Sequence, residues 1–319
     1  MDEFLIIKKY FKNLTKKNPG ALNLNDDVFF DKKNKLILSI DTYNENTHFF
    51  NFKNPYLVIK KIIRSSISDL ICKGVKPKYF FLSGSGNKNH FNKKNLKLIS
   101  KAISDEQKFF NIKLSGGDMT NSKKSSFTVT SVGFSKNIIK RNNTKNNDDI
   151  YITGNLGDSF VGLNILKKKI HLDKKYRNYF INKYYLPNLP IGLIKFINKF
   201  ANSSIDVSDG LFADMHKLIN KQKISFILFA DLIPISKNLK IYLKNVKKSH
   251  LNFISKGDDY QIIFTSNKRN RKYIKRLAKR INQKITLIGS ITNKSGHNKI
   301  ISNGKQLKSK NYEGYFHKF

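Results

Sequence analysis

Cysteine and tryptophan are almost absent from this chain of 319 residues. It has one cysteine, Cys72, and no tryptophan. A single cysteine can form neither an internal disulfide nor a multi-cysteine metal site. The longest apolar run, residues 224–235, is interrupted by Asp231 and falls short of the ~18 residues that a membrane span needs. The first residues lack the basic segment and small-residue cleavage site of a signal peptide. We therefore expect a cytoplasmic protein without a transmembrane helix.

Acidic residues are also scarce. The chain has 22 Asp and Glu against 61 Lys and Arg, which gives a formal net charge of +39. Clustered positive charge is typical of nucleic-acid-binding proteins, because it releases counterions from the phosphate backbone. Here, however, the lysines are spread along the whole chain among many Asn and Ile residues. A nucleic-acid partner is thus the weaker interpretation, and the charge is also suited to attracting small anionic substrates.

Composition and length predict a globular protein of two domains. Hydrophobic residues make up 39% of the chain, enough for packed cores, and the length fits two domains of roughly 150 residues. Helical and strand patterns alternate, which indicates α/β architecture. The Asn-rich stretch 142–149 is the best boundary, so we predict domains at 1–145 and 146–319. Strands are expected at 36–40, 78–83, 113–115, 126–134, 150–153, 204–207, 224–229, 260–264 and 285–291, and helices at 4–14, from Pro55 to Gly74, at 96–110, from Gly157, at 193–200, after Gly210 and at 269–281.

The positions of the few acidic residues are informative. Many of them occupy strand ends, helix ends or glycine turns beside apolar segments, where a fold gains little from a carboxylate that must be desolvated. Such carboxylates suit Mg²⁺, a hard ion that takes oxygen ligands and bridges to phosphates. The acids placed in this way are Asp26, Asp27, Asp41, Asp69, Asp118, Asp206, Asp209, Asp258 and Asp259.

Each of these motifs also has a structural interpretation. Asp27 could belong to an ordinary Asx turn, and Gly116-Gly117-Asp118 could be a tight turn, although its glycines would let backbone N–H groups approach a phosphate. In Asp206-Val207-Ser208-Asp209-Gly210, helix capping by Ser208 or Asp209 is the alternative. An extended chain places Asp206 and Ser208 on the same side, so this motif is the strongest candidate for a site.

Several common catalytic patterns are missing. The sequence has no P-loop pattern, no His-Glu-x-x-His pair and no Gly-x-Ser-x-Gly nucleophile elbow. P-loop nucleotide binding, zinc hydrolase chemistry and covalent serine catalysis therefore lack support.

Taken in order, the motifs make the chain similar to the thiamine-monophosphate kinases, a family of the AIR-synthetase-like (PurM-like) ATP-binding superfamily. The resemblance runs nearly from end to end. It is carried by Asn25-Asp26-Asp27, Ser39-Ile40-Asp41-Thr42 with His48-Phe49, Ser68-Asp69-Leu70, Gly116-Gly117-Asp118, Thr153-Gly154 with Gly157-Asp158-Ser159, Asp206-Val207-Ser208-Asp209-Gly210, Gly257-Asp258-Asp259-Tyr260 and Gly314-Tyr315.

This resemblance implies a two-domain PurM-like fold of α+β type whose N-terminal domain pairs in a homodimer. It implies a kinase that moves the γ-phosphoryl of ATP onto thiamine monophosphate without a phosphoenzyme. Several Mg²⁺ ions would be held by Asp27, Ser39, the backbone carbonyl of Ile40, Asp41, Asp69, Asp118, Asp206 and Asp209. ATP would contact Gly117, Asp118, Arg141 and Ser208, and the acceptor would contact His48, Asp258 and Tyr312.

Some positions depart from the family pattern. Asp258 stands where glutamate is usual and Tyr312 where tryptophan is common, and Ile40 replaces a threonine. Within the superfamily, an enzyme of AIR-synthetase type is the alternative, since it shares the ATP site. From a different class, the alternative is a basic nucleic-acid-binding protein, which leaves the aspartate turns unexplained.

Overall fold

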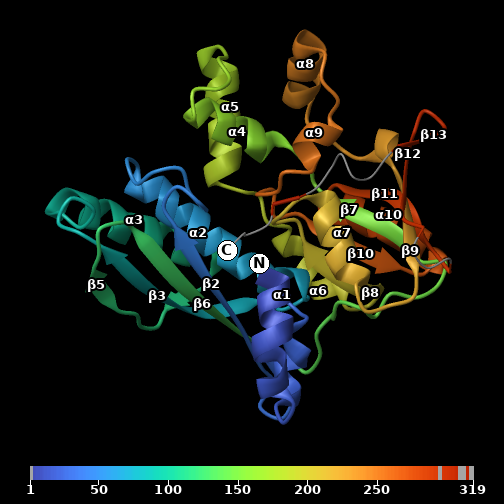
Figure 1. Cartoon of the computed structure of the whole chain (residues 1–319), viewed down its shortest axis with the longest axis horizontal. Coiled ribbons are helices and arrows are strands. Elements are labelled where there is room, and N and C mark those ends of the chain that lie inside the picture. The colour runs from blue at the N-terminus through green and yellow to red at the C-terminus, as the bar shows by residue number, and fades with distance from the viewer. Residues whose placement is uncertain (1–2, 294–296, 308–313, 316–319) are drawn as a thin grey trace.

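The computed structural model describes residues 3–293, 297–307 and 314–315. Two mixed β-sheets lie side by side, the first built from the N-terminal half of the chain and the second from the C-terminal half (Figure 1). The boundary predicted between residues 145 and 146 lies in the segment that joins them, and it stays a prediction.

The first sheet has six strands in the order β1-β2-β6-β3-β4, with β5 also paired to β3. Neighbours from β1 to β3 are antiparallel, whereas β4 and β5 run parallel to β3. The predicted strand at 36–40 is longer than expected, so Asp41 lies inside β2 rather than after it. The strands are β1 (Phe29–Asp31), β2 (Leu36–Asn44), β3 (Pro77–Gly86), β4 (Lys113–Leu114), β5 (Met119–Asn121) and β6 (Ser126–Phe134).

Helices α2 (Pro55–Cys72) and α3 (Lys93–Phe110) cover one face of this sheet. As predicted, α2 begins with Pro55 in its first turn, and the Asn54 side chain accepts a hydrogen bond from Leu57 N (3.1 Å). Its isoleucines supply much of the largest hydrophobic cluster, which extends to residues of both sheets. Because α2 also packs against β8 and α5, it joins the two halves of the molecule.

The other face of the first sheet carries exposed apolar side chains. Ile40 of β2 and Phe81 of β3 both lie opposite Thr130 of β6, so these three side chains share one face. Ile40 is 68% exposed, and Phe81 and Phe134 are also exposed. Ile40, Phe81 and Phe134 form an exposed apolar row. No described segment of the chain covers it.

The N-terminal helix predicted at 4–14 is present but irregular. It starts as α1 (Glu3–Ile6), continues as a π-helical turn over Ile7–Phe11 and ends as a 3₁₀ turn over Lys12–Thr15. Its apolar side chains remain largely exposed, including Leu14 at 79%.

The second sheet has seven strands in the order β13-β12-β9-β11-β7-β10-β8. Its pairs are antiparallel except for β12 with β9, so the whole fold is of α+β type. The short edge pair β12 and β13 was not predicted. The strands are β7 (Asp149–Thr153), β8 (Ala201–Asp206), β9 (Ser225–Phe229), β10 (Ile262–Ser266), β11 (Ile285–Thr292), β12 (Lys299–Ser302) and β13 (Lys305–Leu307).

Helices of the C-terminal half pack around this sheet and also project from it (Figure 1). The helix predicted at 193–200 is shorter, since a 3₁₀ turn at Ile191–Leu193 leads into a single turn, α6. Three further helices, α5, α8 and α9, were not predicted; α4, α5, α8 and α9 form the two projections. The helices are α4 (Asp158–Leu166), α5 (Lys174–Tyr185), α6 (Ile194–Ile197), α7 (Leu211–Ile219), α8 (Lys237–Val246), α9 (Leu251–Ile254) and α10 (Arg271–Arg280). In the described part of the chain, no helix has the length and hydropathy to span a membrane.

Candidate active site

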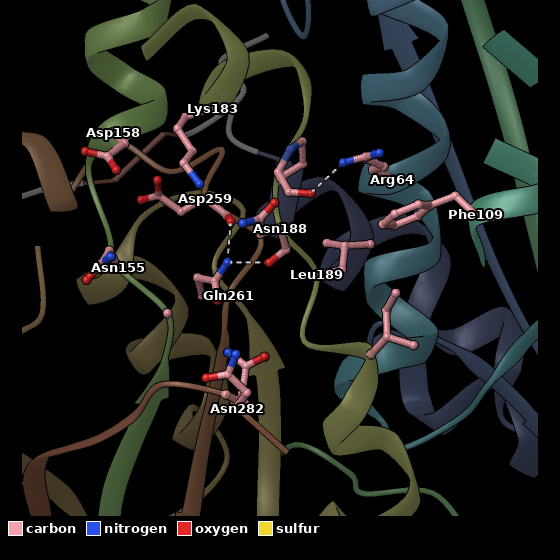
Figure 2. A pocket seen from close by; sticks show the side chains of 14 residues that line it. Arg64, Phe109, Asn155, Asp158, Lys183, Asn188, Leu189, Asp259, Gln261 and Asn282 are labelled. Carbon is pink, nitrogen blue, oxygen red and sulfur yellow. Dashed lines mark hydrogen bonds between the residues drawn. The ribbon is translucent and has the colours of Figure 1, made fainter. Parts of the chain in front are cut away.

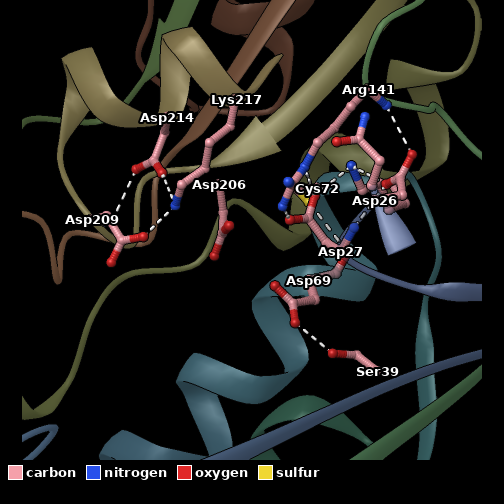
Figure 3. A network of polar contacts seen from close by, with 12 residues as sticks. Asp26, Asp27, Ser39, Asp69, Cys72, Arg141, Asp206, Asp209, Asp214 and Lys217 are labelled. Atoms are coloured by element: carbon pink, nitrogen blue, oxygen red, sulfur yellow. Dashed lines mark hydrogen bonds and ion pairs between the residues drawn. The ribbon is translucent and has the colours of Figure 1, made fainter. Parts of the chain in front are cut away.

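Three predicted aspartates meet where the two halves of the molecule join. Asp27 lies in the loop before β1, Asp69 near the end of α2 and Asp206 at the end of β8. One carboxylate oxygen of each lies within 4.8 Å of the others (Figure 3). Convergence of three carboxylates from distant parts of the chain is what a divalent-cation site requires.

Serine hydroxyls orient two of these carboxylates. Ser39 of β2 donates a hydrogen bond to Asp69 Oδ2, and Ser68 of α2 donates one to Asp206 Oδ2. Asp41 extends from the same face of β2 as Ser39 and accepts a hydrogen bond from the Tyr43 hydroxyl (3.2 Å). The structure therefore groups Ser39 and Asp41 with the three aspartates.

Two internal cations balance part of this negative charge. Lys73, fully buried after α2, contacts Asp26 (2.8 Å) and Asp27 (2.5 Å) and also donates to the Ser204 carbonyl (2.8 Å). The Arg141 guanidinium binds Asp27 through Nε (3.1 Å) and through a second nitrogen. Arg141 is therefore held by the acidic cluster itself.

The remaining negative charge perturbs the aspartates. Burial raises the pKa of Asp41 to about 6 and, against the hydrogen bond from Ser68, that of Asp206 to about 6. Burial, together with the charges of Asp41 and Asp206, also raises the pKa of Asp69 well above its usual range. Burial alone would lower the pKa of Lys73, but the interactions with Asp26, Cys72 and Asp69 together outweigh it and the pKa is raised. Perturbed carboxylates of this kind mark places where a cation is favoured.

The turn after β8 adds Ser208 and Asp209. Asp209 forms an ion pair with Lys217 of α7, which also contacts Asp214 (3.0 Å). Asp214 in turn accepts hydrogen bonds from the backbone N–H groups of Asp209 (3.0 Å) and Gly210 (3.1 Å). Asp214, in the first turn of α7, thus fixes the turn before the helix, on the left of Figure 3.

A pocket of about 470 Å³ connects the acidic cluster with the predicted acceptor residues. Asp41, Asp69, Asp206, Ser208 and Asp209 line one part of it. His48 and Asp258 line the same pocket, together with Ser65, Phe160, Tyr260 and others. The volume is in the range of small-molecule sites. Metal-ligand candidates and acceptor candidates therefore face one cavity.

Asp258 is held by a buried lysine that sequence reasoning missed. The Lys61 ammonium, on α2, lies 2.7 Å from Asp258 Oδ1 and 3.3 Å from the Tyr184 carbonyl oxygen. The same ammonium is 4.2 Å from the centre of the Tyr184 ring, and the Tyr260 hydroxyl donates to Asp258 (3.1 Å). Lys61 is only 1% exposed. It fixes the carboxylate that faces the pocket.

Close backbone packing links the turn around Asp258 to the turn around Ser208. Asp258 N donates to the Ser208 carbonyl (2.9 Å) and Tyr260 N to the Val207 carbonyl (2.9 Å). Gly257 has a φ of +76°, and a Cβ there would lie 2.0 Å from Ser208 O. Only glycine fits this position, so the metal-side turn and the acceptor-side turn behave as one unit.

Not every predicted residue joins this group. The Ile40 side chain lies on the exposed face of β2, so only its backbone could act as predicted. Gly117 and Asp118 lie along β3, where a Cβ on Gly117 would be 1.9 Å from Leu82 O. Asp118 is exposed, accepts a hydrogen bond from Met119 N (2.8 Å) and does not line the pocket.

The predicted acceptor residue Tyr312 lies outside the described residues. Gly314 and Tyr315, close to it in sequence, line the pocket, and Tyr315 N donates a hydrogen bond to Asp209 O (3.0 Å).

A second pocket, of about 350 Å³, is lined by a separate set of residues (Figure 2). Arg64 and Asp259 line it, and they directly adjoin Ser65 and Asp258 of the first pocket. Both are committed to structural contacts, since Arg64 donates to Glu106 (2.8 and 3.0 Å) and Asp259 accepts from Gly157 N (2.8 Å). Of the described residues that the family resemblance assigns to ATP, metal or acceptor, none lines it.

Comparison with known proteins agrees with this geometry. Residues 20–135 match the family model described as AIR synthase related protein, N-terminal domain. The thiamine-monophosphate kinase of Buchnera aphidicola subsp. Schizaphis graminum is 36% identical over 96% of each chain, and that of Aquifex aeolicus is 28% identical over 72% of this chain and 76% of its own. Among solved structures, AaThiL complexed with AMPPCP and TMP has a TM-score of 0.84 at 26% identity and covers 99% of this chain and 97% of its own.

The two mixed sheets and the N-terminal domain match define an AIR-synthase-related protein of PurM-like fold. The sequence identity to the relatives, and the share of the chain that they cover, narrow this class to one family. The chain belongs to the thiamine-monophosphate kinase family.

Proposed function

We propose that this protein transfers the γ-phosphoryl group of ATP to thiamine monophosphate, giving thiamine diphosphate and ADP. The observation that carries the proposal is the single pocket that joins the acidic cluster to His48 and Asp258. It is supported by the relatives, which are thiamine-monophosphate kinases, and by AaThiL, which was solved with AMPPCP and TMP.

Magnesium is the metal that we propose for the acidic cluster. Its donors are carboxylate and hydroxyl oxygens, which suit Mg²⁺ and not a soft metal. Asp27, Asp41, Asp69 and Asp206, with Asp26 beside them, outnumber the neighbouring cations Lys73 and Arg141, and the raised pKa values of Asp41, Asp69 and Asp206 favour an added cation. Bound magnesium would neutralise phosphate charge and align the phosphates for transfer. The roles of Ser39, Ile40, Asp118 and Asp209 as further ligands, and of Gly117 and Ser208 at ATP, belong to the same proposal.

In this reaction the protein has to position two anionic substrates, ATP and thiamine monophosphate. Arg141, now bound to Asp27, can exchange this carboxylate for a phosphate group of ATP, two oxygens of which accept parallel hydrogen bonds from a guanidinium. Lys167 and Lys256 line the pocket and add positive charge near the acceptor. His48 and Asp258 face the thiamine part of the acceptor, and Tyr312 is proposed for the same end.

No covalent intermediate on the protein is proposed. Phosphoryl transfer depends mainly on alignment and charge neutralisation, and a phosphate oxygen of the acceptor can attack the γ-phosphorus directly. The bond to the β-phosphate bridging oxygen breaks as the new oxygen–phosphorus bond forms, and ADP leaves. The residues of the pocket then act by orienting the acceptor oxygen and excluding water.

An assay of purified protein with ATP, Mg²⁺ and thiamine monophosphate tests this function. We expect thiamine diphosphate and ADP to form in equal amounts. Release of ADP with another acceptor, and no thiamine diphosphate, would contradict the proposal and favour an enzyme of AIR-synthetase type.

We further propose that the protein is a cytoplasmic homodimer with domains at 1–145 and 146–319. The exposed apolar row on the first sheet, with Ile40, Phe81 and Phe134, supports a second copy as the partner, because an uncovered face of this kind usually marks an interface. The proposed cytoplasmic location rests on the single cysteine, because proteins of oxidising compartments are commonly stabilised by disulfides.

A further inference from the structure

Helix α2 presents a polar stripe to the active-site pocket. Lys61, Ser65 and Asp69 are spaced four residues apart, so they lie on one side of the helix, about 6 Å apart along its axis. The other side is packed with isoleucines of the main core. Ser65 and Asp69 line the pocket and Lys61 adjoins it through Asp258, so the stripe runs from the acceptor end to the metal end.

The two ends of the stripe have defined partners. Lys61 holds Asp258 at 2.7 Å, and Asp69 belongs to the acidic cluster with Asp27 and Asp206. Ser65 lies between them and lines the pocket, although it is only 3% exposed.

The Ser65 hydroxyl makes no hydrogen bond of ordinary geometry. Its neighbours on α2 do, since Ser66 contacts Ser131 (2.8 Å) and Ser68 binds Asp206. Ser65 has a weak hydrogen-bonding interaction with the Tyr260 hydroxyl, but its geometry is too poor for an ordinary hydrogen bond, and Tyr260 donates its own proton to Asp258. A helical serine can also turn back to the carbonyl of residue i−4, which Ser65 does not do. A buried hydroxyl without a partner is costly, so its position at the pocket indicates a ligand.

We propose that Ser65 is a substrate-binding residue whose hydroxyl donates a hydrogen bond to a phosphate oxygen of bound thiamine monophosphate. This inference rests on the proposed function. In the transfer reaction, the acceptor phosphate must lie between its own thiamine group, at Asp258, and the γ-phosphate of ATP, at the acidic cluster. Ser65 is one helical turn from each of these ends, and a hydroxyl donor to an anionic oxygen forms a strong, charge-assisted hydrogen bond.

The test compares Ser65→Ala with the wild-type protein. Loss of a hydrogen bond to a charged group predicts a fall of about 10-fold or more in kcat/KM for thiamine monophosphate. The KM for ATP should stay within about twofold. Inhibition by unphosphorylated thiamine should not change, because thiamine lacks the group that Ser65 binds. The melting temperature should be equal or higher, since alanine removes an unpaired buried hydroxyl and favours a helix.

Ser159→Ala is the matched control. Ser159 is also buried and also lacks a hydrogen-bond partner, but it does not line the pocket. This variant should keep the wild-type kcat/KM for both substrates. Ser65→Cys, which keeps nearly the same volume with a weaker donor, replaces the alanine variant if that one does not fold, and it should show a smaller loss.

Three results would overturn the inference: an unchanged kcat/KM for thiamine monophosphate, an equal loss for ATP, or a parallel loss of inhibition by thiamine. These failures are distinguishable from failure of the proposed function. Formation of thiamine diphosphate by the wild-type protein tests the function, and only the difference between the variants tests Ser65.

Discussion

Asp69 and Asp206 bring carboxylate oxygens to within 4.8 Å of each other, although one lies on α2 beside the first sheet and the other ends a strand of the second. Neither half of the chain therefore contains the acidic cluster by itself. The packing of α2 against β8 positions these two carboxylates, so the integrity of the site depends on the core that both halves share.

Asp206→Asn should lower the rate of thiamine diphosphate formation on the order of 10²-fold or more, because it removes a charge that faces the phosphates. Asparagine can still accept the hydrogen bond from Ser68, so the melting temperature should change little. The measurement is product formation by chromatography, together with thermal unfolding. Asp231→Asn, in an exposed aspartate that binds Ser302 (2.8 Å), is the control and should keep full activity. Wild-type activity in Asp206→Asn would remove this residue from the site.

Magnesium should stabilise the protein against heat. An ion at about 100 times its dissociation constant adds about 2.7 kcal/mol to the free energy of unfolding if it binds only the folded state, and at this chain length that raises the melting temperature by several degrees. Asp69→Asn should reduce the shift, and chelation of the ion should abolish it. An equal shift in wild-type protein and variant would show that magnesium binds elsewhere.

Lys61→Met should weaken acceptor binding more than nucleotide binding. The variant leaves Asp258 without its ammonium partner at 2.7 Å, so we expect the KM for thiamine monophosphate to rise about 10-fold while the KM for ATP changes little. Steady-state kinetics with each substrate varied in turn measures this difference.

Lys60→Met provides a control on the same helix. Lys60 forms an ion pair with Glu106 (3.1 Å) and does not contact Asp258. The Lys60→Met variant should change only the stability of the protein and leave the KM values for ATP and thiamine monophosphate unchanged. If the two variants behave alike, the effect of Lys61 is on the fold and not on Asp258.

Phe81→Glu should dissociate the proposed dimer, because it places a charge in the exposed apolar row. Sedimentation velocity at micromolar concentration should give a dimer for the wild-type protein and a monomer for the variant. Ile241→Glu, at an exposed position on α8, tests whether any apolar-to-acidic change has this effect. A wild-type protein that sediments as a monomer would contradict the proposal directly.

The sequence predicted most of the regular elements that carry the site. The caps of α2, the strand before Ser208 and the turns at Gly210 and Gly257 have local signals, since proline, asparagine and glycine restrict the backbone in known ways. The helices α5 and α8 were missed because their apolar faces are narrow and interrupted by lysine. Asp41 was placed after its strand because its polarity resembles a strand end, whereas burial beside α2 keeps it inside β2.

The partners of the aspartates were beyond sequence reasoning. Lys61 and Lys73 differ in no local feature from the many exposed lysines of this chain, and only packing shows that both are buried. Lys61 lies on the polar side of α2, away from Ile59 and Ile63, so no hydrophobic pattern marked it. The Ser65 hydroxyl carried no signal either, because serine is common on helices and its lack of an ordinary hydrogen bond is a property of the folded protein.

The ion pair between Arg141 and Asp27 has a consequence for the order in which ligands bind. In the proposed function, a magnesium ion that binds alone would have to displace the Arg141 guanidinium from Asp27. With ATP present, its phosphates would offer Arg141 a new partner, so the exchange would leave no cation unpaired. Metal and nucleotide should then bind more tightly together than the separate affinities would suggest, and the protein would discriminate the magnesium complex of ATP from either component alone.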